Sequence, residues 1–135
     1  MYGNLIRWKS HWTPHWDKII VPENSILYLE AHGYFGTQYL NLSLYIYIYG
    51  GQIANMHINT NLGKINFNQG DVIIYKESST VLYIYYGYNT NAIWHVYNPS
   101  NISGTLTHAY NVPSPSVGSL TKIVQLADYN GQDDF

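Results

Sequence analysis

Histidines and acids are the residues of this sequence whose side chains could hold a metal ion or move a proton. His11 and His15 stand four residues apart in the segment HWTPHW, a spacing that suits a metal site on a helix. Pro14 lies between them and interrupts a helix, and no carboxylate cluster accompanies the pair. The other histidines occur singly along the sequence, at His32, His57, His95 and His108. We therefore expect hydrogen-bonding histidines and no metal site, although a threefold axis could bring three copies of one histidine together.

Acid catalysis on a glycan would need two carboxylates across a cleft. Most interior acids fall where strand ends or turns are expected, at Asp17, Glu23, Asp71 and Glu77. Glu30 differs, because it lies inside the segment LYLEAHG with Tyr28 and His32 on the same face of an expected strand. The sequence has no GxSxG motif, phosphate-binding loop or dinucleotide fingerprint. We predict no catalytic residue, no cofactor and no enzymatic activity, and we keep Glu30 as the acid to test.

The segment YLNLSLYIYIYGG, residues 39–51, alternates between two kinds of side chain. Leucine and isoleucine occupy one parity, and tyrosine, asparagine and serine occupy the other. Because successive side chains of a strand point to opposite faces, this pattern predicts one aliphatic face in a core and one tyrosine-rich face. We expect Tyr45, Tyr47 and Tyr49 on that second face to contact a ligand or another subunit.

A second aromatic segment, TVLYIYYGYNTNAIWHVYN, covers residues 80–98 and carries aromatic side chains on both parities. We expect such strands to be covered on both faces. The core of their own domain would cover one face, and a neighbour such as another copy of the chain would cover the other. Closed homo-oligomers commonly bury amphipathic aromatic surface of this kind. Here the candidates for ligand or subunit contact are Tyr88, Asn89, Asn91 and Trp94.

Tyrosine is preferred over phenylalanine throughout the chain, with 15 tyrosines and only three phenylalanines. Cross-strand ring packing accounts for one or two tyrosines but does not need the hydroxyl group. The preference for tyrosine over phenylalanine therefore indicates rings at surfaces that are partly exposed to water. Aromatic planes stack on the C–H faces of pyranose rings, while amides bond sugar hydroxyls. The many asparagines therefore favour saccharide binding, although asparagine also occupies turns for backbone reasons.

Charge is scarce, at 10% of residues, and the formal net charge is -2. Nucleic acids and anionic lipids attract basic patches, so we expect neither as a partner. The absence of cysteine excludes disulfides and thiolate metal sites. No apolar run reaches membrane-spanning length and the N-terminal segment lacks a signal-peptide core, so we expect no membrane insertion and no signal-dependent secretion.

Period-two patterns bounded by turn residues recur along the chain, and helix signals are nearly absent. The predicted strands cover residues 16–21, 26–34, 39–49, 52–58, 64–68, 71–76, 80–88, 92–97, 104–110 and 122–127. This spacing predicts an all-β fold, an antiparallel β-sandwich or jelly roll. We expect residues 1–15 to form an N-terminal arm and residues 16–135 to form the single domain.

The stretch GDVIIYKESSTVLYIYYGYNTNAIWHVYNPS, residues 70–100, resembles the C-terminal head domains of tailed-phage tail fibres. Residues 71–76 match their strand pattern D-[IV]-[VI]-[VI]-Y-K, and Val81, Tyr83 and Tyr85 match the alternating strand that follows. The upstream segment at residues 18–36 is similar to their opening strands. The sequence departs from the family at SST, residues 78–80, where a DGT turn is usual.

The resemblance implies a homotrimeric β-sandwich at a fibre tip that binds a host-surface glycan or protein. It implies a place in the virion after assembly in the host cytoplasm, which needs neither a signal peptide nor cysteine. It transfers no receptor residues, because those lie in variable loops.

Our first hypothesis is a non-enzymatic receptor-binding head, an adhesin of a phage tail fibre that recognises a host-surface glycan. The alternative is a cellular lectin or carbohydrate-binding module acting as a monomer or dimer. A structural domain without a ligand and an enzyme using Glu30 are the remaining possibilities.

Overall fold

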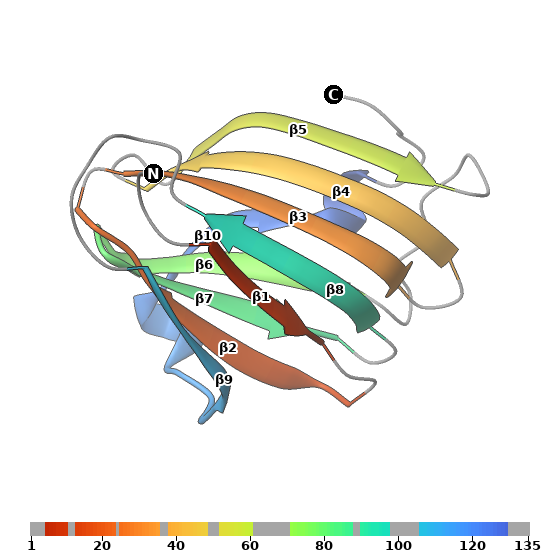
Figure 1. Ribbon diagram of the computed structural model, residues 1–135. Coiled ribbons are helices and arrows are strands. Elements are labelled where there is room, and N and C mark those ends of the chain that lie inside the picture. Colours follow the sequence, from red (N-terminus) through yellow and green to blue (C-terminus); the bar gives the residue numbers. More distant parts are fainter. Residues whose placement is uncertain are drawn as a thin grey trace.

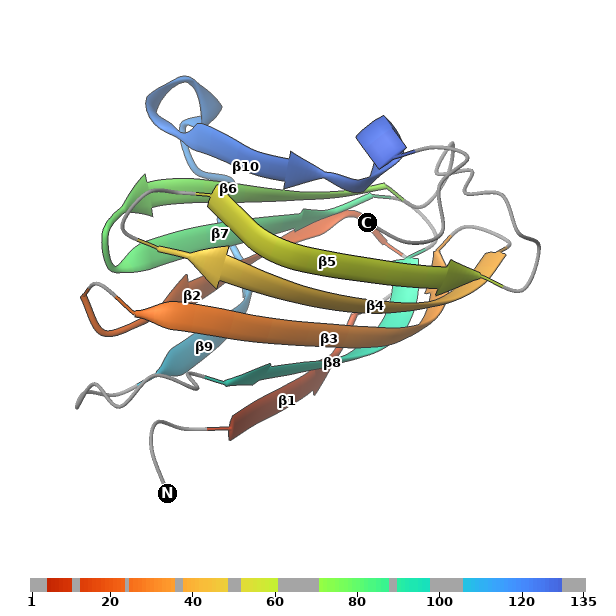
Figure 2. The same cartoon turned by 90° about the horizontal axis from the view of Figure 1, so that it is seen from above.

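The computed structural model of the protein describes residues 5–10, 13–23, 25–35, 38–48, 52–60, 71–87, 90–97 and 106–129. These residues form ten β-strands and two short 3-10 helices. The strands make two five-stranded antiparallel sheets that lie face to face (Figures 1 and 2). The predicted all-β fold and antiparallel sandwich are confirmed, while a jelly-roll arrangement and a homotrimer stay predictions.

Sheet A contains the strands in the order β1-β8-β3-β4-β5. Their bounds are Leu5–Lys9 for β1, Thr90–Tyr97 for β8, Ile26–Phe35 for β3, Gln38–Tyr47 for β4 and Gln52–Thr60 for β5. The central strand β3 pairs with β8 on one side and with β4 on the other. This register places residues from distant parts of the sequence beside one another on each face of the sheet.

Sheet B contains the strands in the order β10-β6-β7-β2-β9. Their bounds are Thr121–Gln125 for β10, Val72–Ser78 for β6, Val81–Tyr86 for β7, His15–Ile20 for β2 and Thr107–Val112 for β9. The 3-10 helices are η1 at Val117–Ser119 and η2 at Leu126–Tyr129. The chain between β9 and β10 connects opposite edges of this sheet, so it belongs to the same domain. No helix in the described ranges has the length and apolar character needed to cross a bilayer.

The core lies between the two sheets and is built from the inward parity of their strands. The aliphatic residues predicted for one face of residues 39–51 are at most 1% exposed: Leu40, Leu42, Leu44, Ile46 and Ile48. Sheet B contributes Ile19, Ile74 and Ile84 from its own inward face. Each buried leucine or isoleucine contributes roughly 1.5–3 kcal/mol relative to an exposed one. The aliphatic face predicted for this segment is confirmed.

Strand β1 is the main difference from the sequence-based expectation. Residues 1–15 were expected to form an arm, yet Leu5–Lys9 pair with β8 at the edge of sheet A, and β2 begins at His15. Ile6 and Trp8 pack partly buried against the core, which explains why this short segment joins the sheet. The strand predicted at residues 64–68 lies outside the described residues.

Gly33 allows β3 and β8 to approach each other closely. Its φ angle is +149°, and a Cβ at this position would lie 2.6 Å from the backbone oxygen of Asn91 and 2.7 Å from the Cα of Ala92. A side chain would therefore force the two central strands apart. The glycine is required by space and by backbone conformation together.

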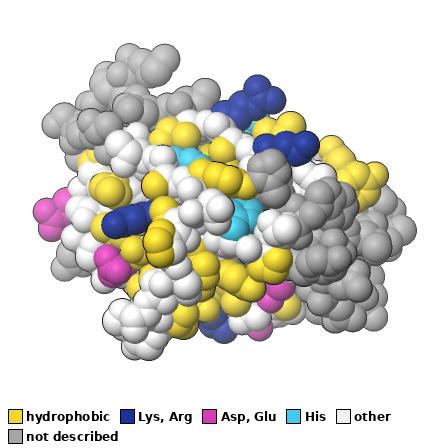
Figure 3. All heavy atoms as spheres, turned by 90° about the horizontal axis from the view of Figure 1, so that it is seen from below, with side chains coloured by type: hydrophobic (Ala, Val, Ile, Leu, Met, Phe, Trp, Pro, Cys, Tyr) yellow, Lys and Arg dark blue, Asp and Glu magenta, His cyan; other side chains and the backbone are white. Residues whose placement is uncertain are grey.

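Charged side chains are sparse on the surface. On the face shown in Figure 3, blue and magenta side chains cover little area among yellow and white ones. A surface of this kind interacts through hydrogen bonds and aromatic planes more than through long-range fields.

Candidate functional site

Cross-strand pairing arranges the outward residues of sheet A in rows. One row contains three tyrosines, because Tyr28 of β3 pairs with Tyr97 of β8 and with Tyr45 of β4. The ring centroids of Tyr28 and Tyr45 are 4.7 Å apart, and those of Tyr28 and Tyr97 are 5.1 Å apart. We call these three residues the first tyrosine row. Such aromatic pairs stabilise a sheet, and here the ring planes are inclined by 68° and 45° to one another.

A second aromatic pair lies further along the same face. Tyr34 of β3 pairs with Tyr39 of β4, and their ring centroids are 5.4 Å apart. Tyr34 is 47% exposed and Tyr39 is 41% exposed. Asn91 of β8 stands next to Tyr34 in the register. We call Tyr34 and Tyr39 the second tyrosine row.

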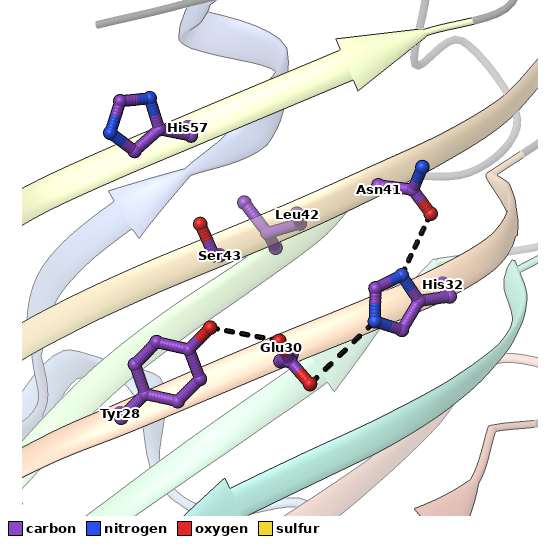
Figure 4. Close-up of a pocket in the computed structure, with 7 residues that line it drawn as sticks. All are labelled: Tyr28, Glu30, His32, Asn41, Leu42, Ser43 and His57. Atoms are coloured by element: carbon purple, nitrogen blue, oxygen red, sulfur yellow. Dashed lines mark hydrogen bonds and ion pairs between the residues drawn. The ribbon is translucent and has the colours of Figure 1, made fainter.

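A shallow hollow of about 200 Å³ lies between the two tyrosine rows. We call it the polar hollow, and its lining residues are Tyr28, Glu30, His32, Asn41, Leu42, Ser43 and His57 (Figure 4). These residues come from β3, β4 and β5, and Ser43 pairs with Glu30 on one side and His57 on the other. The hollow is therefore built on three hydrogen-bonded strands, which hold the backbone of its lining residues in register.

The side chains of the polar hollow form a chain of polar contacts, drawn as dashed lines in Figure 4. The Tyr28 hydroxyl donates to Glu30 Oε2 at 2.8 Å. His32 Nδ1 lies 2.7 Å from Asn41 Oδ1, and because an amide oxygen only accepts, Nδ1 is the protonated donor. His32 Nε2 lies 3.7 Å from Glu30 Oε1. Glu30 and His32 are thus each oriented by a neighbour on one side and face each other on the other.

The environment of Tyr28 raises the pKa of its hydroxyl group. Partial burial, followed by the hydrogen bond to Glu30 and that carboxylate's charge, raises the pKa of Tyr28 from 10.0 to about 12. Tyr28 therefore remains a hydroxyl donor at physiological pH. Its donation keeps one oxygen of Glu30 fixed.

His95 of β8 also belongs to this region, since it pairs directly with Glu30 across β3 and β8. Its ring lies 6.4 Å from the ring of His32, and ligand atoms of Glu30, His32 and His95 all lie within 4.8 Å of one another. His32 and His95 were expected to be separate hydrogen-bonding residues, but strand pairing groups them with Glu30. These residues lie close together because β3 pairs with β8, and this pairing places residues more than 60 positions apart in the sequence beside one another.

The predicted site residues have different positions in the structure. Tyr45, Tyr47 and Asn91 lie on the outer face of sheet A, with Tyr47 49% exposed. Trp94 is fully buried in the core and stacks 6.0 Å from Trp8, so the expected surface role is corrected for this residue. It belongs to the inward parity of β8, opposite to His95. Three predicted residues lie outside the described residues: Tyr49, Tyr88 and Asn89.

Asp17 belongs to a polar cluster between the sheets and has no exposed surface. Its carboxylate accepts hydrogen bonds from His108 Nε2 and from the backbone N–H of Asn111, both at 2.9 Å. His108 stacks on Trp8 with ring centroids 4.0 Å apart. These contacts connect β2 to β9 and satisfy a buried acid, which is a structural role.

Asp71 has a similar role at the edge of sheet B. Its Oδ1 accepts hydrogen bonds from the backbone of Val72 and Ala127, and its Oδ2 accepts one from Gln125 Nε2. The acid that opens the motif resembling the fibre heads therefore holds the C-terminal segment against β6.

Comparisons with known proteins found no match to this chain among family models, curated proteins or solved structures.

Proposed function

We propose that the protein binds a saccharide in the polar hollow of sheet A and serves as a non-enzymatic receptor-binding head. The observation that carries this proposal is the position of the polar hollow between two tyrosine rows. A pyranose ring has apolar C–H faces and a polar rim of hydroxyls. It needs ring planes and hydrogen-bonding groups within a few ångströms of each other, and sheet A presents both.

The aromatic part of the site comes from rings that are open to solvent. Tyr34 and Tyr39 are each more than two-fifths exposed. The C–H bonds of a sugar carry slight positive charge and lie favourably on the negative face of an aromatic ring. The hydroxyl of a tyrosine keeps the edge of the same ring compatible with water.

The polar part of the site matches sugar hydroxyls, which both donate and accept hydrogen bonds. Asn41 and Ser43 bring an amide and a hydroxyl to the hollow, and Glu30 brings an acceptor. The volume of about 200 Å³ is below the roughly 300–1,000 Å³ of typical ligand pockets. We infer that one sugar ring occupies the hollow while the rest of the glycan runs over the tyrosine rows.

A binding function fits the site better than hydrolysis does. Among the described residues that line the hollow, Glu30 is the one acid. Most glycosidases need a second carboxylate about 5–9.5 Å away to act as nucleophile or base. Glu30 is instead held by Tyr28 as a fixed acceptor.

The phage fibre head remains our proposal for the biological setting, with the protein at a fibre tip as a homotrimer. Residues 18–100 resemble such heads, and the outer face of sheet B offers a second aromatic surface to a sister subunit. Trp16 on this face lies 5.0 Å from Tyr85 and 5.6 Å from Tyr75, measured between ring centroids. Two separate faces would then serve assembly and recognition.

A glycan array tests the saccharide proposal. We expect wild-type protein to bind a restricted set of surface glycans. Tyr34→Ala and Asn41→Ala should each weaken that binding about 2- to 10-fold, the loss of one stacking contact or hydrogen bond. Tyr110→Ala is the matched control, since Tyr110 is 43% exposed but lies on β9 of sheet B. No binding by folded wild-type protein, or equal losses in the control, would contradict the proposal.

A cellular lectin or carbohydrate-binding module is the second candidate. It is favoured by the position of the polar hollow on three adjacent strands of one sheet, β3, β4 and β5. Light scattering separates the two candidates, because a monomer that binds glycans supports the lectin and a trimer supports the fibre head.

A further inference from the structure

We propose that Glu30, His32 and His95 form a binding site for a divalent transition-metal ion of the zinc class on the outer face of sheet A. The proposal goes beyond saccharide binding and does not depend on it. It rests on the ligand types, their mutual orientation and the groups that hold them.

The three residues supply one carboxylate and two imidazoles from two adjacent strands. Their ligand atoms lie within 4.8 Å of one another. Zinc binds imidazole nitrogen and carboxylate oxygen at about 2.0–2.2 Å, so the three groups must close around an ion by roughly 1–1.5 Å. The side chains of His32 and Glu30 are 40% and 37% exposed, respectively, so rotation about their side-chain bonds has room.

Neighbouring residues already hold two of the ligands in the required orientation. Asn41 accepts the Nδ1 proton of His32, which leaves the lone pair of Nε2 for a ligand. That Nε2 is the nitrogen that faces Glu30. Tyr28 fixes Glu30 Oε2 and leaves Oε1 directed at His32. Metal-binding histidines and carboxylates are held by second partners in this same way.

His95, the third proposed ligand, has a buried ring nitrogen that makes no hydrogen bond to the described residues. Nδ1 of His95 is enclosed and has no hydrogen-bond partner within the described part of the chain. A buried nitrogen without a partner is energetically costly. A cation bound through Nδ1 would satisfy this atom.

The donor set selects the kind of metal. Calcium and magnesium prefer all-oxygen sites, whereas imidazole nitrogen suits zinc, cobalt, nickel and iron. Three protein ligands leave at least one coordination position open for water or another ligand. Arg7 pairs with His95 on β1, but it is exposed, so its charge is screened by solvent and salt.

Calorimetric titration of the tag-free protein with Zn²⁺ tests the site, with Co²⁺ absorption as a report on the ligands. We expect one ion per chain. His95→Gln and His32→Gln should abolish that binding. His57→Gln should retain it, because His57 lines the same hollow from β5 but is outside the group of three. Circular dichroism checks that each variant is folded.

The positioning residues provide a second readout. Asn41→Ala and Tyr28→Phe keep all three ligands, and we expect each to lower the affinity for Zn²⁺ about 10- to 100-fold. The proposal is overturned if folded wild-type protein binds no Zn²⁺. It is also overturned if His95→Gln binds as tightly as wild type, or if His57→Gln loses as much affinity as His95→Gln.

Discussion

At the residue scale, acidic side chains have different roles in the two sheets. Glu30 is partly exposed and faces His32 and Tyr28 on an outer surface, whereas Asp17 is enclosed and hydrogen-bonded to His108 and Asn111. The alternation of the sequence predicted the shared face of Tyr28, Glu30 and His32. It could not predict that His95 joins them, because this depends on strand pairing over a long sequence separation.

The buried carboxylate of Asp17 gives a prediction about stability. Asp17→Ala leaves His108 and the Asn111 N–H without their acceptor inside the protein. Each unsatisfied buried group costs about 1–3 kcal/mol, so the free energy of unfolding should fall by at least about 2 kcal/mol. Urea denaturation measures the loss. Glu23→Ala is the control, since Glu23 is exposed, and its effect should stay within about 0.5 kcal/mol. Equal effects of the two substitutions would show that Asp17 is not a structural acid.

At the element scale, strong alternation predicted β4 well, because its aliphatic parity is long and uninterrupted. Strand β1 was missed because its five residues include Arg7 and Lys9 and give only two inward side chains, Ile6 and Trp8. Such a short pattern becomes visible only when β8 is there to pair with it. The polar hollow was likewise not predictable, since it depends on the β3–β4–β5 register.

The contact between β3 and β8 is tested by Gly33→Ala. The added Cβ would lie 2.6 Å from the Asn91 oxygen, at a φ angle that side chains rarely adopt. We expect a loss of stability greater than about 1 kcal/mol. Gly118→Ala in η1 is the matched control, because nothing lies within 4 Å of its added Cβ, and it should change stability by less than about 0.5 kcal/mol. A neutral Gly33→Ala would mean that the two strands are not this close. Thermal or chemical denaturation of both variants provides the comparison.

At the scale of the whole molecule, the abundant tyrosines make stability sensitive to high pH. The pKa values of Tyr28, Tyr86 and Tyr110 are raised above 10.0, first by burial and then by the nearby acids Glu30 or Asp17. A raised pKa means that the folded state holds the phenol proton more tightly than the unfolded state does. The stabilisation is therefore complete below pH 10 and is lost as pH rises toward 12 and above.

Chemical denaturation on either side of the tyrosine transition, at about pH 8 and about pH 11, measures this loss. We expect the free energy of unfolding to fall between the two conditions. The fall should be smaller in Tyr28→Phe, which removes one of the shifted phenols. Stability that stays constant up to about pH 11 would show that these hydroxyls are not held in the way the structure shows.

Substitutions on the aromatic outer face of sheet B test whether the protein assembles into a trimer. If sister subunits cover it, Tyr85→Asp should shift the mass in light scattering from trimer to monomer, because a charge would be buried at the contact. Tyr34→Asp on sheet A should leave a trimer intact. A wild-type monomer at micromolar concentration would contradict the fibre-head proposal.

Saccharide recognition by sheet A is tested most directly by titrating isotope-labelled protein with the best glycan from the array and following its backbone amide signals by NMR. We predict that the perturbed signals cluster on β3 and β4, at His32, Tyr34, Asn41 and Ser43, while the signals of Trp16 and Tyr85 in sheet B stay unchanged. Perturbations confined to sheet B, with none around the polar hollow, would contradict the account.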